Sequence, residues 1–417
     1  MTDTADTSTN PVTDTVPERC PVTDLATDYD MFDPNYLRDP FSAWAELRDT
    51  CPIAHTERYG GSWLPTKYDD LQAMAKMVPT LSSKSPIVID MPEALVDSDA
   101  TGYNAAAPIS ADPPEQSWTR RALLPHFTPK AIGPQTEYTQ RLCNELIDGF
   151  IGDGGCDAAV DYAQQIPPRV IAHKLGVDEG MVDDFIEWVR GLLELGLQDP
   201  ELRAKYRKII RAFFAAEVAD RRVNPRDDLI TALCQTEVDG EFLPDEVVIG
   251  MCNLQLVAGI DTTWSSIGSA LWHFAGHDDD RRRLATEPEL WDTALEEMLR
   301  FYAPVTMARN AAEDVEYGGV TFKKGDKILM NFPGANHDPD IFENAGEVVL
   351  DRQRNRHIAF GVGIHRCAGS NLARMEMEVA LKAWFERIPE FTLSDPDAVT
   401  WCGGQIRGPR KLPVVFG

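Results

Sequence analysis

The sequence contains no run of eighteen or more apolar residues, so it predicts no membrane-spanning helix. Residues 1 to 20 are rich in Thr, Asp and Pro and lack the basic and apolar regions of a signal peptide. A Walker-type phosphate loop and a Rossmann fingerprint are also absent. We therefore expect neither a membrane anchor nor a recognisable flavin or nicotinamide site in this chain.

Paired cysteines and positive charge are scarce as well. The eight cysteines are scattered without paired spacing, which favours a reducing compartment over a disulfide framework and predicts a cytoplasmic protein. Lys and Arg number 40 against 67 Asp and Glu, giving a net charge of −27. Nucleic acids and anionic membranes bind basic surfaces, so neither is an expected partner.

What is present is an ordinary globular composition: 417 residues, 43% of them hydrophobic, enough for a large core. Residues 1–28 are polar and acidic and predict a flexible tail. Helical spacing dominates the rest, with short strand patterns in the first and last quarters, and residues 79–111 read as loop. The expected fold is mainly α with a smaller β region, in a single domain from residue 29 to 417.

One stretch organises the chain: Phe-Gly-Val-Gly-Ile-His-Arg-Cys-Ala-Gly at residues 360–369, directly before a helical pattern. Cys367 lies at this helix start, where the dipole and unpaired N–H groups favour a thiolate, a ligand for iron. The glycines allow positive φ and close approach of a flat partner, and Phe360 offers a ring beside it. The alternative is a buried free cysteine in a turn.

A second stretch interrupts a long apolar helix predicted from Pro244 to about Gly276. Its centre reads Ala-Gly-Ile-Asp-Thr-Thr at residues 258–263, placing a carboxylate and two hydroxyls among apolar residues. Buried polar groups need partners or a function, and glycine with threonine permits a local opening of the helix. The alternative is a kink packed against ordered water.

The pattern Phe-Gly-x-Gly-x-His-x-Cys-x-Gly resembles the haem-ligand signature of the cytochrome P-450 family. Four separated motifs in the expected order extend the resemblance over residues 35–417. It implies the P-450 fold, with the long helix over haem b and Cys367 as the axial thiolate. It further implies that Asp261 and Thr262 are the acid and the alcohol that deliver protons to dioxygen, with Ala258 and Gly259 leaving room for the gas.

The resemblance also implies contacts to the cofactor from polar groups at its propionates and from loop residues beside its ring. By alignment with the camphor-hydroxylating bacterial member these are Gln116, Arg120, Ala258, Gly259, Arg309, His357, Phe360, Gly361, Cys367 and Gly369. Glu297, Arg300 and Arg352 would form a buried structural triad behind the cysteine loop. Without the resemblance, Arg120 would be read as part of a solvated basic face, and Glu297 with Arg300 as a surface ion pair.

The implied function is monooxygenation of a small, mostly apolar substrate such as a terpenoid. The aligned pocket residues are Tyr103, Asn104, Leu254, Val257, Val305 and Ile406. Electrons would come from a separate iron–sulfur ferredoxin and its flavin reductase, docking where Arg120, Arg121, Arg366 and Arg374 converge. The alternatives are a peroxide-using peroxygenase, which would not need the acid and alcohol, a haem-binding sensor, which would not need an open groove, and a non-haem thiol enzyme, for which His365 is a poorly placed base.

Overall fold

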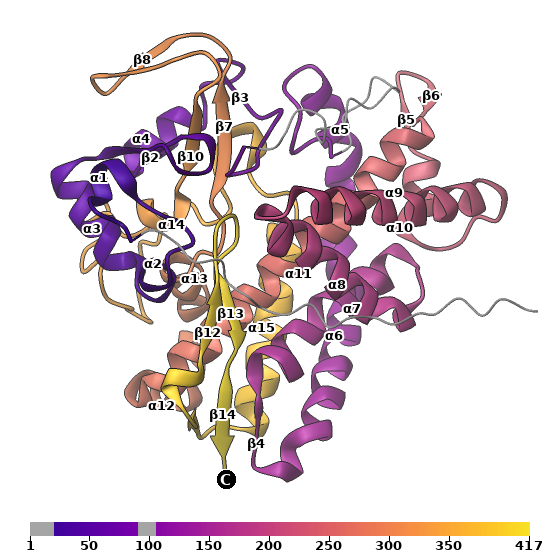
Figure 1. The fold of residues 1–417 in the computed structure, drawn as a ribbon. Coiled ribbons are helices and arrows are strands. Elements are labelled where there is room, and N and C mark those ends of the chain that lie inside the picture. The colour runs from indigo at the N-terminus through magenta and orange to yellow at the C-terminus, as the bar shows by residue number, and fades with distance from the viewer. Residues whose placement is uncertain (1–20, 91–105) are drawn as a thin grey trace, which may run out of the picture.

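The computed structural model describes residues 21–90 and 106–417, arranged as a helical body beside a smaller part built around a sheet (Figure 1). The helix α11 (Asp245–Gly276) crosses the middle of the molecule. The other long helices are α3 (Pro40–Thr50), α6 (Pro129–Phe150), α7 (Ile166–Leu175), α8 (Val182–Leu193), α9 (Pro200–Val223), α13 (Trp291–Phe301) and α15 (Ser370–Arg387). The shorter ones are α1 (Leu25–Asp28), α2 (Pro34–Arg38), α4 (Tyr68–Met74), α5 (Glu115–Leu123), α10 (Leu229–Cys234), α12 (Asp278–Thr286) and α14 (Phe332–Ala335).

The central helix α11 is apolar on nearly all sides, because α7, α8, α9 and α15 pack around it. Within the described ranges it is the one helix whose length and composition would suffice to cross a membrane. Two thirds of its most apolar window is buried by the rest of the fold, as in the core of a globular domain. Its apolar character is therefore explained by packing within the protein.

The main sheet has the strand order β1-β2-β10-β7-β3 and lies on the side of the molecule that carries α1 to α4 (Figure 1). Its strands are β1 (Ile53–Thr56), β2 (Ser62–Pro65), β10 (Lys327–Met330), β7 (Met307–Ala311) and β3 (Leu81–Ser82). Only the β2–β10 pair is parallel. The sheet thus joins the first quarter of the chain to the segment that follows α13.

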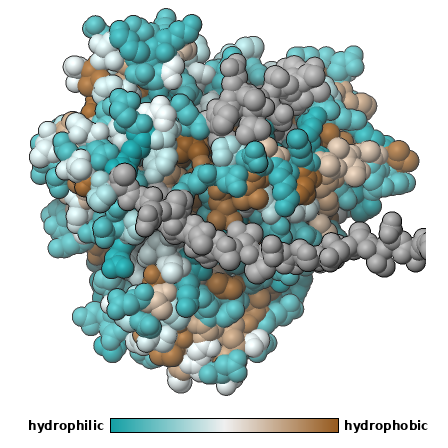
Figure 2. Space-filling model, in the orientation of Figure 1, coloured by the Kyte–Doolittle hydropathy of each residue, from teal (hydrophilic) through white to brown (hydrophobic). Residues whose placement is uncertain are grey.

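Smaller sheets attach the last residues to the helical body. Strand β14 (Pro413–Phe416) lies between β11 (Phe391–Leu393) and β4 (Gly155–Asp157), and β12 (Thr400–Cys402) pairs with β13 (Gly408–Lys411). Two hairpins, β5 (Glu237–Val238) with β6 (Glu241–Phe242) and β8 (Val315–Tyr317) with β9 (Val320–Phe322), complete the strands. The face drawn in Figure 2 is mainly hydrophilic, with hydrophobic residues showing towards its middle and right edge.

Two glycine positions show how closely neighbours approach α11. A Cβ on Gly259 would lie 2.7 Å from Cδ1 of Ile171 in α7, and one on Gly268 would lie 2.9 Å from Cγ of Pro409 in β13. Such distances are too short for any side chain without movement of the neighbour. Glycine at these positions lets α7 and β13 pack directly on the helix backbone.

The mainly α fold with a smaller β region agrees with the sequence prediction. The flexible tail was predicted to extend to residue 28. In the structure, α1 already forms within its last residues, and Asp28 pairs with Arg58 at 2.6 Å. The predicted loop at residues 79–111 includes β3, and its residues 91–105 lie outside the described ranges.

Candidate active site

The cysteine loop is shaped by its own backbone. Cys367 N–H donates to the carbonyl of Phe360 at 2.8 Å, closing the loop just before α15. Gly361 and Gly363 have φ values of +67° and +74°, which residues with a Cβ rarely adopt. A Cβ on Gly363 would also lie 3.2 Å from the carbonyl oxygen of Ala75. Glycine is therefore required here for conformation and for space.

The Cys367 side chain has solvent-accessible surface, although it is surrounded deeply enough that burial raises the pKa of its thiol. The N–H of Gly369 and the charges of nearby arginines act in the opposite direction and do not outweigh burial. Without a metal, burial therefore opposes the thiolate that the helix start was predicted to favour. A metal bound at Cys367 would deprotonate the thiol outright.

Next to the loop, Glu296 of α13 contacts Arg374, which was expected in the docking patch, and His357, which was expected at a propionate. Arg374 donates to both carboxylate oxygens at 2.5 and 2.8 Å, and its guanidinium lies 4.5 Å from the Phe360 ring centroid. Nε2 of His357 lies 2.9 Å from the same carboxylate. Arg374 is thus engaged by an ion pair instead of adding an uncompensated charge to a docking patch.

His357 was expected at a haem propionate, and in the structure its Nε2 lies beside the carboxylate of Glu296. The histidine beside Arg309 is His365, two residues before Cys367. Burial, reinforced by the charges of Arg309 and Arg120, lowers the pKa of His365 to about 4. Among the described residues, none hydrogen-bonds the buried Nε2 of His365 or the buried Nε of Arg309. The geometry therefore favours His365, together with Arg309, as the group that meets an anion.

The other expected propionate contacts, Gln116 and Arg120, come from α5. Gln116 is buried and its Nε2 donates to the carbonyl of Ile364 at 2.7 Å, while Arg120 Nη2 donates to the carbonyl of Arg366 at 2.5 Å. Both side chains therefore fix carbonyls of the cysteine loop. Burial lowers the pKa of Arg120, an effect that the charge of Cys367 opposes, so this arginine also lies close to the thiol.

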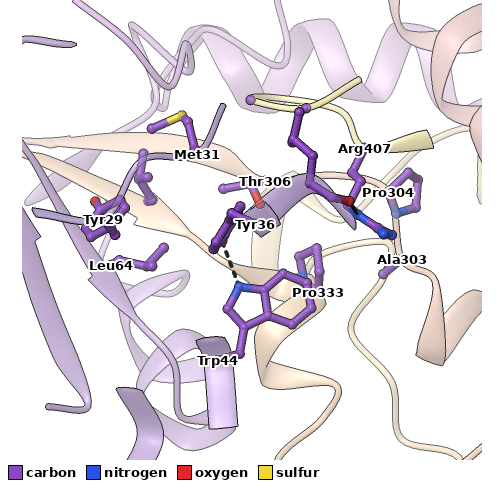
Figure 3. Close-up of a pocket in the computed structure, with 14 residues that line it drawn as sticks. Tyr29, Met31, Tyr36, Trp44, Leu64, Ala303, Pro304, Thr306, Pro333 and Arg407 are labelled. Atoms are coloured by element: carbon purple, nitrogen blue, oxygen red, sulfur yellow. Dashed lines mark hydrogen bonds between the residues drawn. The ribbon is translucent and has the colours of Figure 1, made fainter. Parts of the chain in front are cut away.

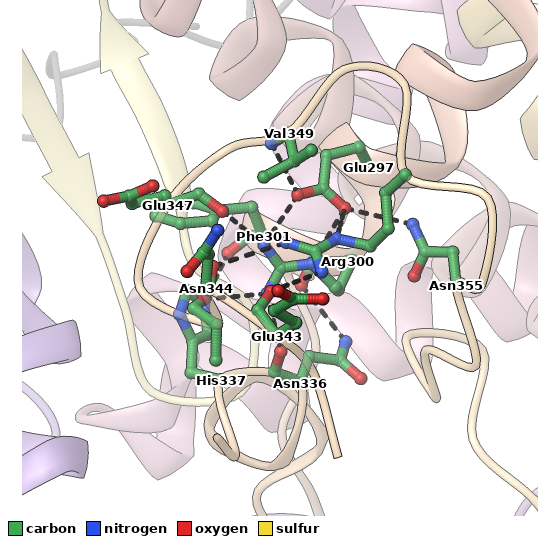
Figure 4. A network of polar contacts seen from close by, with 12 residues as sticks. Glu297, Arg300, Phe301, Asn336, His337, Glu343, Asn344, Glu347, Val349 and Asn355 are labelled. Carbon is green, nitrogen blue, oxygen red and sulfur yellow. Dashed lines mark hydrogen bonds and ion pairs between the residues drawn. The ribbon is translucent and has the colours of Figure 1, made fainter. Parts of the chain in front are cut away.

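Behind the loop, Glu297, Arg300 and Arg352 come together in the buried network of Figure 4. Arg300 donates to both oxygens of Glu297 at 2.7 and 2.8 Å, and Arg352 Nε donates to Oε2 at 2.9 Å. The N–H of Val349 and the amide of Asn355 complete the carboxylate's partners. Glu297 and Arg300 are fully buried, which excludes a solvent-exposed surface pair.

On α11, accessible positions recur on one side of an otherwise buried helix. Ala258 is exposed, whereas Leu254, Val257 and Thr262 are half-buried, and the spacing 254, 258, 262 places three of them on one stripe. Thr262 Oγ1 donates to the carbonyl of Ala258 at 2.9 Å. The stripe is therefore a part of this core helix that the described residues leave partly uncovered.

Gly259, expected to leave room for dioxygen, instead accommodates Ile171 of α7. Asp261, expected to connect Thr262 to solvent, is fully buried and its Oδ1 accepts a hydrogen bond from Arg410 at 2.7 Å. Burial raises the pKa of Asp261, and Arg410 opposes the rise. Asp261 and Thr262 are neighbours on the helix, with the acid buried and the alcohol partly accessible. Gly259 allows α7 to pack on α11.

The pocket residues are placed in part. Val305 pairs with Ile406 across an isolated antiparallel bridge, and Leu254 and Val257 lie on the accessible side of α11. Tyr103 and Asn104 lie outside the described residues. A recess with about 30 Å³ of water-accessible volume lies between the first helices and the sheet and is lined in part by Thr306 (Figure 3). That volume is enough for one or two water molecules and far below that of a substrate pocket.

Comparison with known proteins identifies the family to which the chain belongs. The family model described as "Cytochrome P450" matches residues 286–397. The chain is 32% identical over 397 residues to the "Polyketide biosynthesis cytochrome P450 PksS" of Bacillus subtilis (strain 168), covering 92% of this chain and 98% of that protein. It is also 32% identical over 402 residues to the "6-deoxyerythronolide B hydroxylase" of Saccharopolyspora erythraea, with the same coverage of both chains. The chain belongs to the cytochrome P450 family.

The crystal structure of CYP101J2 shares the fold of this cytochrome P450, with a TM-score of 0.83, 28% identity, and coverage of 96% of this chain and 100% of that one. Relatives named as hydroxylases establish the chain as a monooxygenase of this family, whose cofactor is haem with a cysteine thiolate as axial ligand. Cys367 is the cysteine of the signature.

The residues of this P450 fit the cofactor. The thiol is exposed, and Arg309 and His365 present buried nitrogens that lack partners within the described part of the chain, as expected of groups that bind the propionates. The sequence analysis considered His365 only as a base for Cys367, and not as a propionate ligand. The signal for it was present in the signature, whose only fixed histidine is His365.

Proposed function

We propose that this cytochrome P450 inserts one oxygen atom of dioxygen into a mostly apolar substrate, with Cys367 holding haem iron and Thr262 and Asp261 handling protons. The observations that carry the proposal are an exposed Cys367 in the haem-signature loop and an accessible stripe of α11 that ends at Thr262. When bound, haem supplies the activation of dioxygen. The chain supplies orientation, proton delivery and exclusion of water.

Each residue has a defined task in this proposal. Arg309 and His365 bind the propionates, while Gln116 and Arg120 keep the loop carbonyls of Ile364 and Arg366 in place. Thr262 donates to the Ala258 carbonyl in the structure. Because its side chain is partly accessible, its hydroxyl can also turn toward a bound ligand and pass on a proton. Asp261, one residue earlier on the helix, is the acid that resupplies it.

The substrate proposed is a molecule with a large hydrocarbon surface and no carboxylate. Leu254, Val257, Val305 and Ile406 are aliphatic, and each buried contact would contribute about 1–3 kcal/mol to binding. A terpenoid is the class that the sequence favours, and the name of one relative adds polyketides to the classes to be tested. A spectral titration with terpenoids, polyketides and fatty acids distinguishes them by the low-spin to high-spin change.

The electron donor proposed is a separate ferredoxin with its reductase. Arg366 and Ile364 are exposed in the cysteine loop, and Lys76 is exposed beside Gly363. Arg121 and Leu124 are exposed at the end of α5, the helix whose Arg120 contacts the loop. In a chain with a net charge of −27, this basic and apolar face suits an acidic partner. A cytoplasmic location is proposed because the seven cysteines of the described residues are all free.

The decisive experiment is the spectrum of the reduced, haem-loaded protein with carbon monoxide. Thiolate ligation predicts the red-shifted Soret band, and Cys367→His should abolish it while retaining haem. Turnover with a surrogate ferredoxin and reductase should then consume NADPH in a substrate-dependent way. An imidazole-type carbonyl spectrum in the wild-type protein would refute the proposal, and efficient turnover with peroxide alone would favour a peroxygenase.

A further inference from the structure

Asp261, the acid of α11, accepts a hydrogen bond from Arg410 of β13, which is distant in the sequence. Arg410 of β13 donates through Nη2 to Asp261 Oδ1 at 2.7 Å and through Nη1 to Ser265 Oγ at 3.2 Å, and Ser265 donates to the same Oδ1. The other oxygen of Asp261, Oδ2, is buried and accepts no hydrogen bond from any residue that the structure describes. One carboxylate oxygen is thus fixed and the other is free.

The arginine itself has little freedom to move. A Cβ on Gly408 would lie 2.3 Å from Ser265 Oγ, and Pro409 packs against Gly268, so the two residues before Arg410 lie directly on α11. The Arg410 guanidinium also stacks 5.2 Å from the Trp264 ring centroid. The strand therefore carries Arg410 as a fixed part of the α11 surface.

A second carboxylate shares this arginine. Arg410 Nε donates to Glu194 Oε2 at 2.8 Å, and Glu194 follows directly after α8. Arg190, one turn earlier in α8, donates to both oxygens of Glu194 at 3.1 and 3.2 Å. Two anions, Asp261 and Glu194, thus compete for the buried cation of Arg410. Asp261 lies on α11, whereas Glu194 lies at the C-terminal end of α8.

We propose that Arg410 is a positioning residue for Asp261, fixing Oδ1 so that Oδ2 is the oxygen that exchanges protons, and that Glu194 weakens this hold by sharing the arginine. The inference rests on the proposed function of Asp261 and adds its regulation. Because Glu194 belongs to the end of α8, the position of that helix sets how strongly the acid retains its proton.

The electrostatics give opposite signs for the two neighbours. Arg410 favours the ionised form of Asp261, whereas the charge of Glu194 disfavours it. The ionisable groups around Asp261 are Arg410 of β13, Glu194 and Arg190 of α8, and Cys402 of β12. Removing the cation should make Asp261 easier to protonate, and removing the competing anion should make it harder.

The test compares Arg410→Gln with Glu194→Gln in the haem-loaded enzyme and uses Lys411→Gln, an exposed position on the same strand, as the matched control. Protonation of Asp261 is followed in the resting protein by the infrared band of its carboxylic acid, identified by its loss in Asp261→Asn. The midpoint should move to higher pH in Arg410→Gln and to lower pH in Glu194→Gln, and Lys411→Gln should leave it unchanged.

Turnover supplies a second readout. In Arg410→Gln the product formed per NADPH should fall by about tenfold, because a misplaced proton donor loses much of its effect. The solvent deuterium isotope effect should rise, and Arg410→Lys should restore part of the loss. Equal midpoints in the two variants, or shifts of the same sign, would overturn the inference. If Arg410→Gln does not fold, Glu194→Gln and Arg410→Lys still decide it, since an unchanged midpoint in both would refute it.

Failure of the inference is separable from failure of the proposed function. A wild-type protein that lacks the thiolate carbonyl band refutes the function itself. A protein that shows this band and loses coupling in Thr262→Ala, but whose Asp261 midpoint ignores Arg410 and Glu194, refutes only the role of the arginine.

Discussion

Arg352 Nε and Glu297 Oε2 are joined by a 2.9 Å hydrogen bond across 55 residues of sequence. The bond ties the segment before the cysteine loop to α13, and Arg300 extends it by donating to the carbonyls of Asn336, Ala345 and Glu347. The chain at Asn336 and the chain from Ala345 to Val349 are therefore both held by one buried carboxylate and one buried guanidinium (Figure 4). We expect the position of the cysteine loop to depend on this network.

Replacement of Glu297 by Gln should lower the free energy of unfolding by about 3–5 kcal/mol, because it leaves buried arginines without their anion. Urea unfolding measures the change, and haem retention should fall with it. Glu378→Gln, which removes a partly exposed ion pair with Lys382 on α15, is the control and should cost less than about 1 kcal/mol. A loss of that small size in Glu297→Gln would contradict the structural role.

The stability of the protein should depend on pH through Glu296. Burial would raise the pKa of Glu296, but hydrogen bonds and charges from Arg374 and His357 outweigh it and hold the pKa at about 2. A depressed folded-state pKa gives stability that is complete above the ordinary value near 4.5 and is lost as the pH falls toward 2. Wild type should therefore exceed Glu296→Gln by at most about 3 kcal/mol at pH 6, and the gap should narrow below pH 4.5. A gap that stays constant down to pH 3 would contradict this assignment.

Thr262→Ala should bind substrate normally while diverting reducing equivalents to hydrogen peroxide or water, because the accessible hydroxyl beside Asp261 is lost. Product formed per NADPH consumed is the measurement, and a fall of about tenfold or more is expected. Thr263→Ala is the matched control, since Thr263 is the next hydroxyl on α11 but is buried. Equal coupling in Thr262→Ala and the wild type would count against the proton role.

Packing of α7 on α11 predicts coupling between Ile171 and Gly259. In the wild type Ile171→Val should cost about 1 kcal/mol, because it removes a buried methyl group. In Gly259→Ala the added Cβ would occupy the space near that Cδ1, so the same change should cost little. Additive effects in the double variant would show that the close approach is not what selects glycine at this position.

Arg366→Glu should slow reduction by a ferredoxin, with a loss that grows smaller at high salt, because this exposed arginine lies in the cysteine loop. Stopped-flow reduction under carbon monoxide measures the rate. Lys208→Glu makes the same charge change at an exposed position on α9 and should leave the rate unchanged. Equal slowing by both variants would mean that total charge, and not this face, governs docking.

Local signals predicted the fold well. The helices at 245–276 and 370–387 lie within a few residues of the predicted ranges, because apolar periodicity and local start signals define them. The motif also identified Cys367 and the acid next to the alcohol. These features depend on residues that are neighbours in sequence.

Contacts between distant segments could not be predicted in this way. His357 lies beside Glu296 and His365 beside Arg309, and these neighbours come from segments distant in sequence. Gly259 reads as an opening until Ile171 is placed beside it. Arg410 lies 149 residues from Asp261, so no local pattern joins them.

The attachment of β13 and β14 to the helical body has a consequence for how the chain folds. Strand β14 pairs with β4, and Leu412 N–H donates to Asp157 across 255 residues. Closing so large a loop costs more entropy than any local step, and contacts of this kind slow folding. The helices can therefore form early, whereas the environment of Asp261 is completed only when this loop closes. A folding intermediate that still lacks β13 would leave a carboxylate in the core without its cation, so the same arginine that serves the acid would also make the final step of folding cooperative.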